Sequence, residues 1–300
     1  MLIAALSRCI PVACCFSLLL FLKPVTAAER PSLPYHQQKN VVYAEVHGVG
    51  LLLDIFTPVG QANGLAIVDV ASGAYHSDRG KIRDHKRAQM FDIFCSRGYT
   101  VFAIRPGSIA KFNGPEMLEN VNRGIVWVKD HAKEYQVDPD RLALLGASAG
   151  GHLACMAAVS AAEQNAKTRV KAVAVFFPPT DLMNYGGFKI DISGEDALAS
   201  SIRRLITPKG SETMNADQLD ALRTAFSPAR LVKPGLPPFL IIHGTADFMV
   251  PIQQSRVMVA ALQKAEVPVK FIIKQGGGHP WPTIHEEVEK MADWIDGQLK

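Results

Sequence analysis

The chain has 300 residues, of which 48% are hydrophobic and 20% charged. This composition excludes an intrinsically disordered protein and suits one or two folded domains. The net charge of +4 comes from 32 basic and 28 acidic residues, and this balance argues against a nucleic-acid partner.

Residues 1–28 have the pattern of a secretory signal peptide. Arg8 supplies the positive charge, an apolar run is densest over 16–22, and small residues follow at 25–28. The apolar run is shorter than the roughly 20 consecutive apolar residues that a membrane span needs. We therefore expect an exported protein, periplasmic or extracellular, with no stable membrane span after signal removal. An uncleaved N-terminal anchor is the alternative.

Strand-like and helix-like patterns alternate along the rest of the chain. After a loose leader over 30–40, runs at 41–46 and 51–56 flank a His-Gly-Val-Gly turn and predict a hairpin. We expect further strands at 65–70, 99–104, 141–146, 170–176, 239–243 and 267–273, and helices at 83–96, 115–134, 149–161, 252–264 and 283–299. This alternation predicts an α/β fold with a mostly parallel central sheet and helices on both faces, in a single domain over 29–300.

Residues 181–236 interrupt this alternation, because they contain no convincing strand. Helix-like pieces lie near 195–206 and 216–225. Long irregular segments in compact domains often serve as lids or binding loops, so we interpret this segment as a cap or lid insertion. The alternative is an ordinary surface excursion.

The strongest chemical signal is Gly146-Ala147-Ser148-Ala149-Gly150, which lies between a predicted strand and a predicted helix. In a G-x-S-x-G motif of this context, the glycines allow a sharp turn that exposes the serine hydroxyl. We therefore expect Ser148 to be a nucleophile at the carboxyl edge of the sheet. The alternative is a glycine-rich turn that only packs tightly.

A serine nucleophile needs a base within hydrogen-bond reach and an acid that orients the base. His279 lies in a glycine-rich loop after the last predicted strand and is the expected base. His152 is expected to brace the serine turn, and His243 to lie in the core or brace a loop. Asp247, after the strand at 239–243, is the expected acid, with Asp181 as the alternative.

These motifs resemble those of the α/β-hydrolase superfamily, in the esterase/lipase branch related to acetyl-xylan and feruloyl esterases and to the prolyl oligopeptidase catalytic domain. The resemblance runs from about residue 41 to the C-terminus, and it implies a catalytic triad of Ser148, Asp247 and His279. The matching segments are 138–141, 146–152, 178–182, 237–247, Val250-Pro251 and Gly278-His279.

One departure from this family pattern concerns the loop that holds the oxyanion. Such esterases usually carry His-Gly-Gly-Gly-Trp after the third strand, whereas this chain has Ala71-Ser72-Gly73-Ala74-Tyr75. The bracing histidine is missing, so we expect the loop to be held in another way. Because backbone donors do not depend on side-chain identity, we expect the N–H of Ala149 and that of Gly73 or Ala74 to form the oxyanion hole.

The resemblance implies a serine carboxylesterase that hydrolyses small or carbohydrate-linked esters of acetyl or feruloyl type through an acyl-enzyme. No cofactor or metal is expected, and Cys95 and Cys155 are expected to be buried, inert thiols. A prolyl oligopeptidase-like serine peptidase is one alternative function. A non-catalytic binding protein on a hydrolase scaffold is the other. The motifs predict no oligomeric state.

A basic cluster follows the predicted oxyanion loop. It could attract an anionic substrate, or it could be the solvated start of a helix, because Asp78 and Asp84 are interspersed with it. The cluster consists of Arg79, Lys81, Arg83, Lys86 and Arg87.

Overall fold

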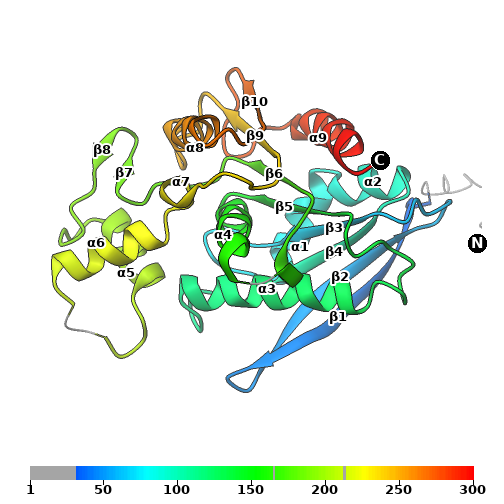
Figure 1. The fold of residues 1–300 in the computed structure, drawn as a ribbon, viewed down its shortest axis with the longest axis horizontal. Helices are drawn as coiled ribbons and strands as arrows, with labels where there is room; N and C mark the ends of the chain where they lie inside the picture. Colours follow the sequence, from blue (N-terminus) through cyan, green and yellow to red (C-terminus); the bar gives the residue numbers. More distant parts are fainter. Residues whose placement is uncertain (1–31, 165, 212–213) are drawn as a thin grey trace, which may run out of the picture. The chain divides into compact units, whose positions relative to one another are not determined.

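A central sheet of eight strands organises the fold (Figure 1). The computed structural model describes residues 32–164, 166–211 and 214–300. The strands are β1 (Tyr35–Val46), β2 (Val49–Pro58), β3 (Ala66–Val70), β4 (Thr100–Arg105), β5 (Leu142–Ala147), β6 (Ala172–Phe176), β9 (Phe239–Gly244) and β10 (Val269–Lys274). Their order is β1-β2-β4-β3-β5-β6-β9-β10. The β1–β2 and β2–β4 pairs are antiparallel, and the other pairs are parallel.

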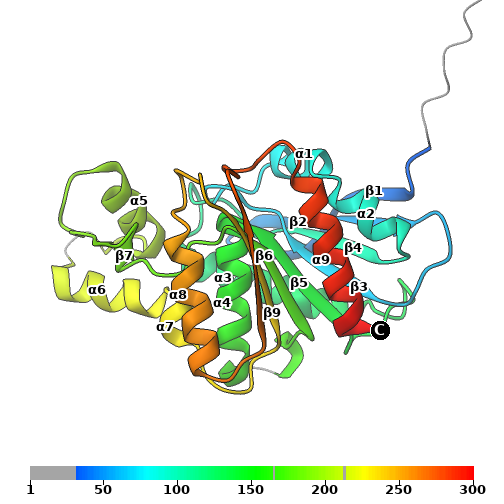
Figure 2. The same cartoon turned by 90° about the horizontal axis from the view of Figure 1, so that it is seen from above.

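Helices cover both faces of this sheet (Figure 2). One face carries α1 (Arg79–Arg87), α2 (Met90–Ser96) and α9 (Ile284–Leu299), and the other carries α3 (Gly114–Asp130), α4 (Ala149–Gln164) and α8 (Gln253–Lys264). Successive side chains of a strand point to opposite faces, so Ile67 and Val68 of β3 belong to different buried clusters. The predicted α/β fold with a mostly parallel sheet is confirmed.

The segment 181–236 contains more regular structure than expected. It holds the short strands β7 (Asn184–Tyr185) and β8 (Phe188–Lys189) and the helices α5 (Ala197–Ile206), α6 (Ala216–Ala225) and α7 (Pro228–Leu231). The two predicted helical pieces are confirmed, whereas the β7–β8 hairpin was not expected. In both views α5, α6 and this hairpin lie together beyond α7 and α8. Buried Arg223 stabilises the segment by donating to the carbonyls of Leu182 and Ile190 at 3.3 and 3.1 Å.

The N-terminal boundary of the first strand was predicted too late. The loose leader expected over 30–40 is largely part of β1, which begins at Tyr35. The carboxylate of Asp54 on β2 is buried and accepts hydrogen bonds from the Gln37 side chain and the Asn40 backbone N–H. These bonds and the β1–β2 pairing explain why the polar residues at the start of β1 form a strand. The pairing has two register irregularities, at 38–41 and 42–44.

The single helix predicted over 83–96 is instead two helices. Asp78 begins α1 four residues earlier than expected, because its side chain accepts from the N–H of Gly80 at 2.5 Å. Gln89, with a φ of 57°, separates α1 from α2. The helix predicted over 115–134 ends at Asp130.

The predicted signal peptide, residues 1–28, lies outside the described residues. Leu33–Lys300 form one compact unit. Within the described ranges, no helix is both long enough and apolar enough to cross a bilayer. Cys95 and Cys155 are buried free thiols, as predicted.

Candidate active site

Ser148 lies at the turn between β5 and α4, at the carboxyl end of the strand. Its φ of 54° is in the left-handed region that residues with a side chain rarely adopt. Its N–H donates to the carbonyl of Phe176 at 2.9 Å, which ties the turn to the end of β6. The residue is only partly buried.

The flanking glycines are required by close backbone packing. A Cβ on Gly146 would lie 2.4 Å from the carbonyl oxygen of Gly150, and a Cβ on Gly150 would lie 2.1 Å from that of Val70. Both distances are shorter than any side-chain carbon tolerates. The G-x-S-x-G pattern therefore reflects a turn packed closely against β3, and the tight packing given as the alternative is present together with a partly buried serine.

The structure brings Ser148, Asp247 and His279 into one hydrogen-bonded chain. His279 Nε2 lies 2.9 Å from Ser148 Oγ, and His279 Nδ1 lies 2.6 Å from Asp247 Oδ2. Because the carboxylate can only accept, Nδ1 carries a proton and Nε2 is free to accept from the serine hydroxyl. This geometry suits a serine nucleophile with a histidine base and an orienting acid.

Two loops bring Asp247 and His279 together. Gly244 ends β9, and a Cβ there would lie 2.2 Å from the carbonyl oxygen of Gly277, so only glycine allows this approach. The N–H of Ala246 donates to the same Gly277 carbonyl at 2.9 Å. The histidine loop is thus held against the aspartate loop by backbone contacts.

The carboxylate of Asp247 is fully buried. Burial alone would raise its pKa, but hydrogen bonds with His243, His279 and the N–H of Val250 outweigh it and hold the pKa well below the usual range. Asp247 is therefore ionised at neutral pH and can stabilise a positive charge on His279.

The alternative acid Asp181 lies apart from this chain, whereas His243 and His152 lie next to its members. Asp181, the alternative acid, pairs with Arg230 at 2.8 and 3.0 Å and has no contact with His279. His243 is buried beside Asp247, where its Nδ1 lies 2.6 Å from Ser255 Oγ and its Nε2 donates to the Val250 carbonyl at 2.8 Å. His152 is buried behind the serine turn. Both histidines therefore have the bracing positions that were predicted for them.

The predicted oxyanion loop is a two-residue turn. The N–H of Gly73 donates to the His76 carbonyl, and the N–H of His76 donates to the Gly73 carbonyl, both at 2.9 Å. Ala74 and Tyr75 between them have φ of 48° and 59°, the positive values of a type I′ turn. Gly73 has thus committed its N–H, whereas in the described chain neither Ala74 nor Ala149 uses its N–H in a hydrogen bond. Of the two predicted alternatives, Ala74 is the one with a free donor.

The motifs did not indicate two further residues near the site. The ring of Phe177 lies 4.2 Å from that of His279, centroid to centroid, and forms one wall beside the imidazole. Tyr75 donates its hydroxyl to His152 Nδ1. Tyr75 stands at the place of the aromatic residue in the family pattern, which was the available signal for it. Phe177 follows a strand without any distinguishing motif.

The basic cluster of residues 79–87 is largely paired within the protein. Arg79 pairs with buried Asp54 at 2.9 Å, and Lys86 donates to Gln37. Lys81 and Arg87 both pair with Asp84, at 3.0 and 3.2 Å. This pairing favours the solvated helix start over an anion-binding site.

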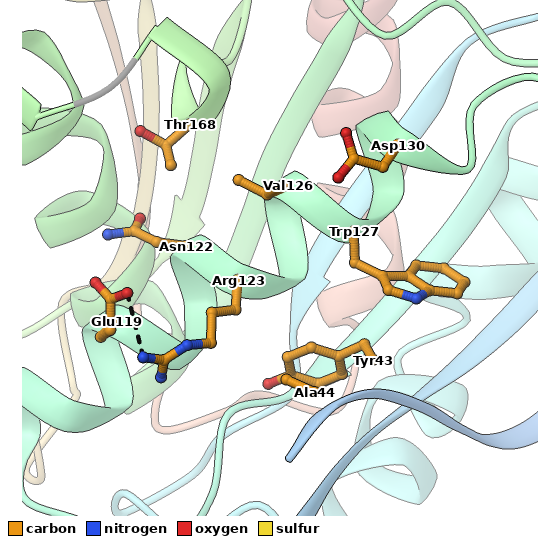
Figure 3. Close-up of a pocket in the computed structure, with 9 residues that line it drawn as sticks. All are labelled: Tyr43, Ala44, Glu119, Asn122, Arg123, Val126, Trp127, Asp130 and Thr168. Carbon is orange, nitrogen blue, oxygen red and sulfur yellow. Dashed lines mark ion pairs between the residues drawn. The ribbon is translucent and has the colours of Figure 1, made fainter. Parts of the chain in front are cut away.

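A cavity of about 470 Å³ lies away from Ser148, between α3, β1 and the short helix η1 (Ala166–Thr168) (Figure 3). Trp127 and Tyr43 line one part of it, and an ion pair between Glu119 and Arg123 lines another. None of its lining residues belongs to the chain of Ser148, His279 and Asp247.

Comparison with known proteins identifies the family. The model of the family described as BD-FAE matches residues 53–262, which is more than half of the chain. The chain belongs to the BD-FAE family. The matched region of this BD-FAE protein contains Ser148 and Asp247, and His279 lies beyond its end.

Curated relatives of this BD-FAE chain include two proteins of Mycobacterium tuberculosis. The chain is 30% identical to the probable carboxylic ester hydrolase LipM over 58% of its own length and 40% of that protein. It is 31% identical to the esterase LipQ over 60% of its own length and 42% of that protein. The chain thus spans about two fifths of the length of these relatives.

Solved structures share the fold. A truncated form of a carbohydrate esterase from gut microbiota superimposes with a TM-score of 0.75 at 23% identity, over 89% of this chain and 97% of that one. Esterase 2 of Thermogutta terrifontis, phosphorylated by paraoxon, gives a TM-score of 0.64 at 24% identity, over 88% and 94%. These likenesses show that the BD-FAE chain has the α/β-hydrolase fold predicted for it.

Proposed function

We propose that this protein is a serine carboxylesterase that hydrolyses small or carbohydrate-linked esters of acetyl or feruloyl type. The observation that carries the proposal is the hydrogen-bonded chain from Ser148 through His279 to the buried carboxylate of Asp247. Curated relatives named as ester hydrolases support the reaction class. The fold shared with a carbohydrate esterase is consistent with the substrate class.

The reaction proceeds in two steps. His279 Nε2 takes the Ser148 proton while Oγ bonds to the ester carbonyl carbon, and the N–H groups of Ala149 and Ala74 hold the resulting oxyanion. His279 then gives the proton to the leaving alcohol as its C–O bond breaks, which leaves an acyl-enzyme. Water attacks the acyl carbon by the same route, releases the acid and restores the serine hydroxyl.

The test is hydrolysis of 4-nitrophenyl acetate by the wild-type protein, Ser148→Ala and, as a matched control, Ser160→Ala on the same helix. We expect turnover by the wild type and Ser160→Ala, and a loss of at least about 10³-fold in Ser148→Ala. A fluorophosphonate should label the wild type and not Ser148→Ala. Absence of both turnover and labelling in the wild type would leave only a non-catalytic binding function.

The rates of hydrolysis of acetylated xylan, methyl ferulate and a proline-containing peptide amide compare the candidate substrate classes. Faster cleavage of the peptide than of any ester would favour the prolyl oligopeptidase-like alternative.

We further propose export through the predicted signal at residues 1–28, which rests on the sequence pattern. N-terminal sequencing of the protein recovered from the producing cell's exterior or periplasm tests it, and an intact residue 1 there would support the anchor alternative.

A further inference from the structure

The loop of residues 73–76 has an unusual backbone conformation at two residues that carry side chains. Ala74 and Tyr75 both adopt positive φ, a conformation that is unfavourable for L-residues and persists only where the surroundings impose it. The reciprocal Gly73–His76 hydrogen bonds close the turn, and two backbone bonds hold its ends: the N–H of Gly150 donates to the Ser72 carbonyl at 3.0 Å, and the N–H of Ile109 donates to the Tyr75 carbonyl at 2.8 Å. These bonds hold residues 72 and 75, whereas the free N–H of Ala74 lies between them, so a side-chain contact of the turn can further restrict where that N–H points.

Tyr75 makes that contact. Its hydroxyl is hydrogen-bonded to His152 Nδ1, and the two rings pack edge to face with centroids 5.7 Å apart. His152 is fully buried on α4, one turn after the serine, and its backbone N–H donates to the Ser148 carbonyl at 2.9 Å. The residue that holds the loop thus belongs to the turn that carries the predicted nucleophile.

The second nitrogen of His152 is also bonded. Nε2 lies 3.0 Å from the carbonyl oxygen of Phe226, the residue that ends α6 within the segment 181–236. The Phe226 ring packs against the imidazole at 4.8 Å. One imidazole therefore joins the loop of Tyr75, the serine turn and the segment 181–236.

These contacts determine the protonation of the group. Burial lowers the pKa of His152 to about 4, so the imidazole is neutral at pH 7. The Phe226 carbonyl can only accept, so Nε2 carries the proton and Nδ1 must accept. Burial, with a smaller contribution from nearby Tyr185, raises the pKa of Tyr75 well above its usual value, so its hydroxyl stays protonated and donates.

We propose that Tyr75 and His152 are positioning residues that place the Ala74 N–H as an oxyanion donor, with the Phe226 carbonyl of the segment 181–236 as their anchor. The inference rests on the proposed esterase function. Without the Tyr75 hydroxyl the turn loses its side-chain bond to α4, and the Ala74 N–H can shift relative to Ser148 although the backbone bonds of Ser72 and Tyr75 remain. Because the oxyanion exists only in the transition state and the tetrahedral intermediate, the loss should lower kcat and leave KM nearly unchanged.

Tyr75→Phe removes only the hydroxyl and tests the inference directly. With 4-nitrophenyl acetate we expect kcat to fall about 10-fold to 10²-fold and KM to stay within about twofold; the fall is smaller than the roughly 10²-fold to 10³-fold for full loss of one oxyanion donor, because the Ala74 N–H is displaced and not removed. Inhibition by a trifluoromethyl ketone, whose adduct carries an oxyanion, should weaken in parallel with kcat. The matched control is Tyr43→Phe, which removes a buried phenol bonded to the Arg105 carbonyl outside the site and should leave kcat unchanged.

A second pair of variants separates positioning from folding. His152→Gln keeps one acceptor and one donor on the side chain, whereas His152→Leu keeps neither. We expect the Gln variant to retain more of the wild-type kcat than the Leu variant when both are compared as folded protein by circular dichroism. Wild-type kcat and ketone inhibition in Tyr75→Phe would overturn this inference alone. A wild-type protein with neither turnover nor Ser148 labelling would overturn the proposed function and this inference with it.

Discussion

The imidazole of His243 lies 3.4 Å from the carboxylate of Asp247, on which His279 also converges. His243 is fully buried and is bonded to Ser255 and to the Val250 carbonyl. Asp247 is thus supported from within the core as well as from the loop of His279. The resemblance to a known family assigned no role to this second histidine.

This relationship predicts that His243→Ala is destabilising. The substitution opens a cavity and leaves the Val250 carbonyl without its donor, so we expect the free energy of unfolding to fall by about 2–4 kcal/mol. Urea unfolding at pH 7 measures the change. His36→Ala, at an exposed site on β1, is the control and should shift stability by no more than about 0.5 kcal/mol. Equal stabilities of the two variants would contradict the supporting role.

The two candidate acids should respond differently to amide substitution. Asp247→Asn should lower kcat for 4-nitrophenyl acetate by about 10⁴-fold, because the amide no longer holds His279 in the reactive tautomer. Asp181→Asn should leave kcat within a few-fold and cost about 1 kcal/mol of stability, since its partner Arg230 is 37% exposed. Steady-state kinetics and urea unfolding of both variants show which aspartate orients His279. A larger loss of kcat in Asp181→Asn than in Asp247→Asn would assign that role to Asp181.

Gly150 and Gly297 should give opposite results when replaced by alanine. The added Cβ at Gly150 would lie 2.1 Å from the Val70 carbonyl oxygen, so we expect a loss of about 3 kcal/mol or more. A Cβ at Gly297 on α9 meets no atom within 4 Å, so this variant should gain about 0.5 kcal/mol from helix propensity. Thermal unfolding of the two variants measures both signs. A neutral Gly150→Ala would show that the turn can move away from β3.

His152 should make stability depend on pH between about 4 and 6.5. In this window the unfolded chain protonates His152 and the folded chain does not, because burial lowers the folded pKa to about 4. Stability therefore rises with pH across the window, by about 3 kcal/mol from this residue. His152→Gln should remove the contribution of His152 to the pH dependence of the free energy of unfolding. Urea titrations at several pH values measure this dependence. An unchanged slope would mean that His152 is protonated in the folded protein.

The local features of the site could be predicted because short-range constraints encode them. The turn at Ser148 requires its two flanking glycines, and all of these residues lie within one five-residue motif. A loop that follows a strand end is where α/β enzymes place catalytic groups. The positions of Asp247 and His279 relative to strand ends were therefore informative. Their convergence depends on Gly244 and Gly277, whose close approach joins two loops of different strands and has no pattern within either loop alone.

Other features depend on contacts between distant segments. The strand at Tyr35 could not be recognised, because its polar residues pair with β2 and with buried Asp54. The helix break at Gln89 has no glycine or proline to mark it. The brace between Tyr75 and His152 joins residues 77 positions apart, and the family pattern indicated a missing histidine and an aromatic residue at position 75 but not the contact between Tyr75 and His152.

The irregular pairing of β1 has a consequence for the behaviour of the whole chain in solution. β1 is at one edge of the sheet, and its register with β2 shifts twice along its length. An edge strand with bulges and exposed polar residues such as His36 and Lys39 offers no long, flat row of backbone donors and acceptors to another strand. The outer edge formed by this polar stretch thus disfavours strand-to-strand aggregation between copies of the protein.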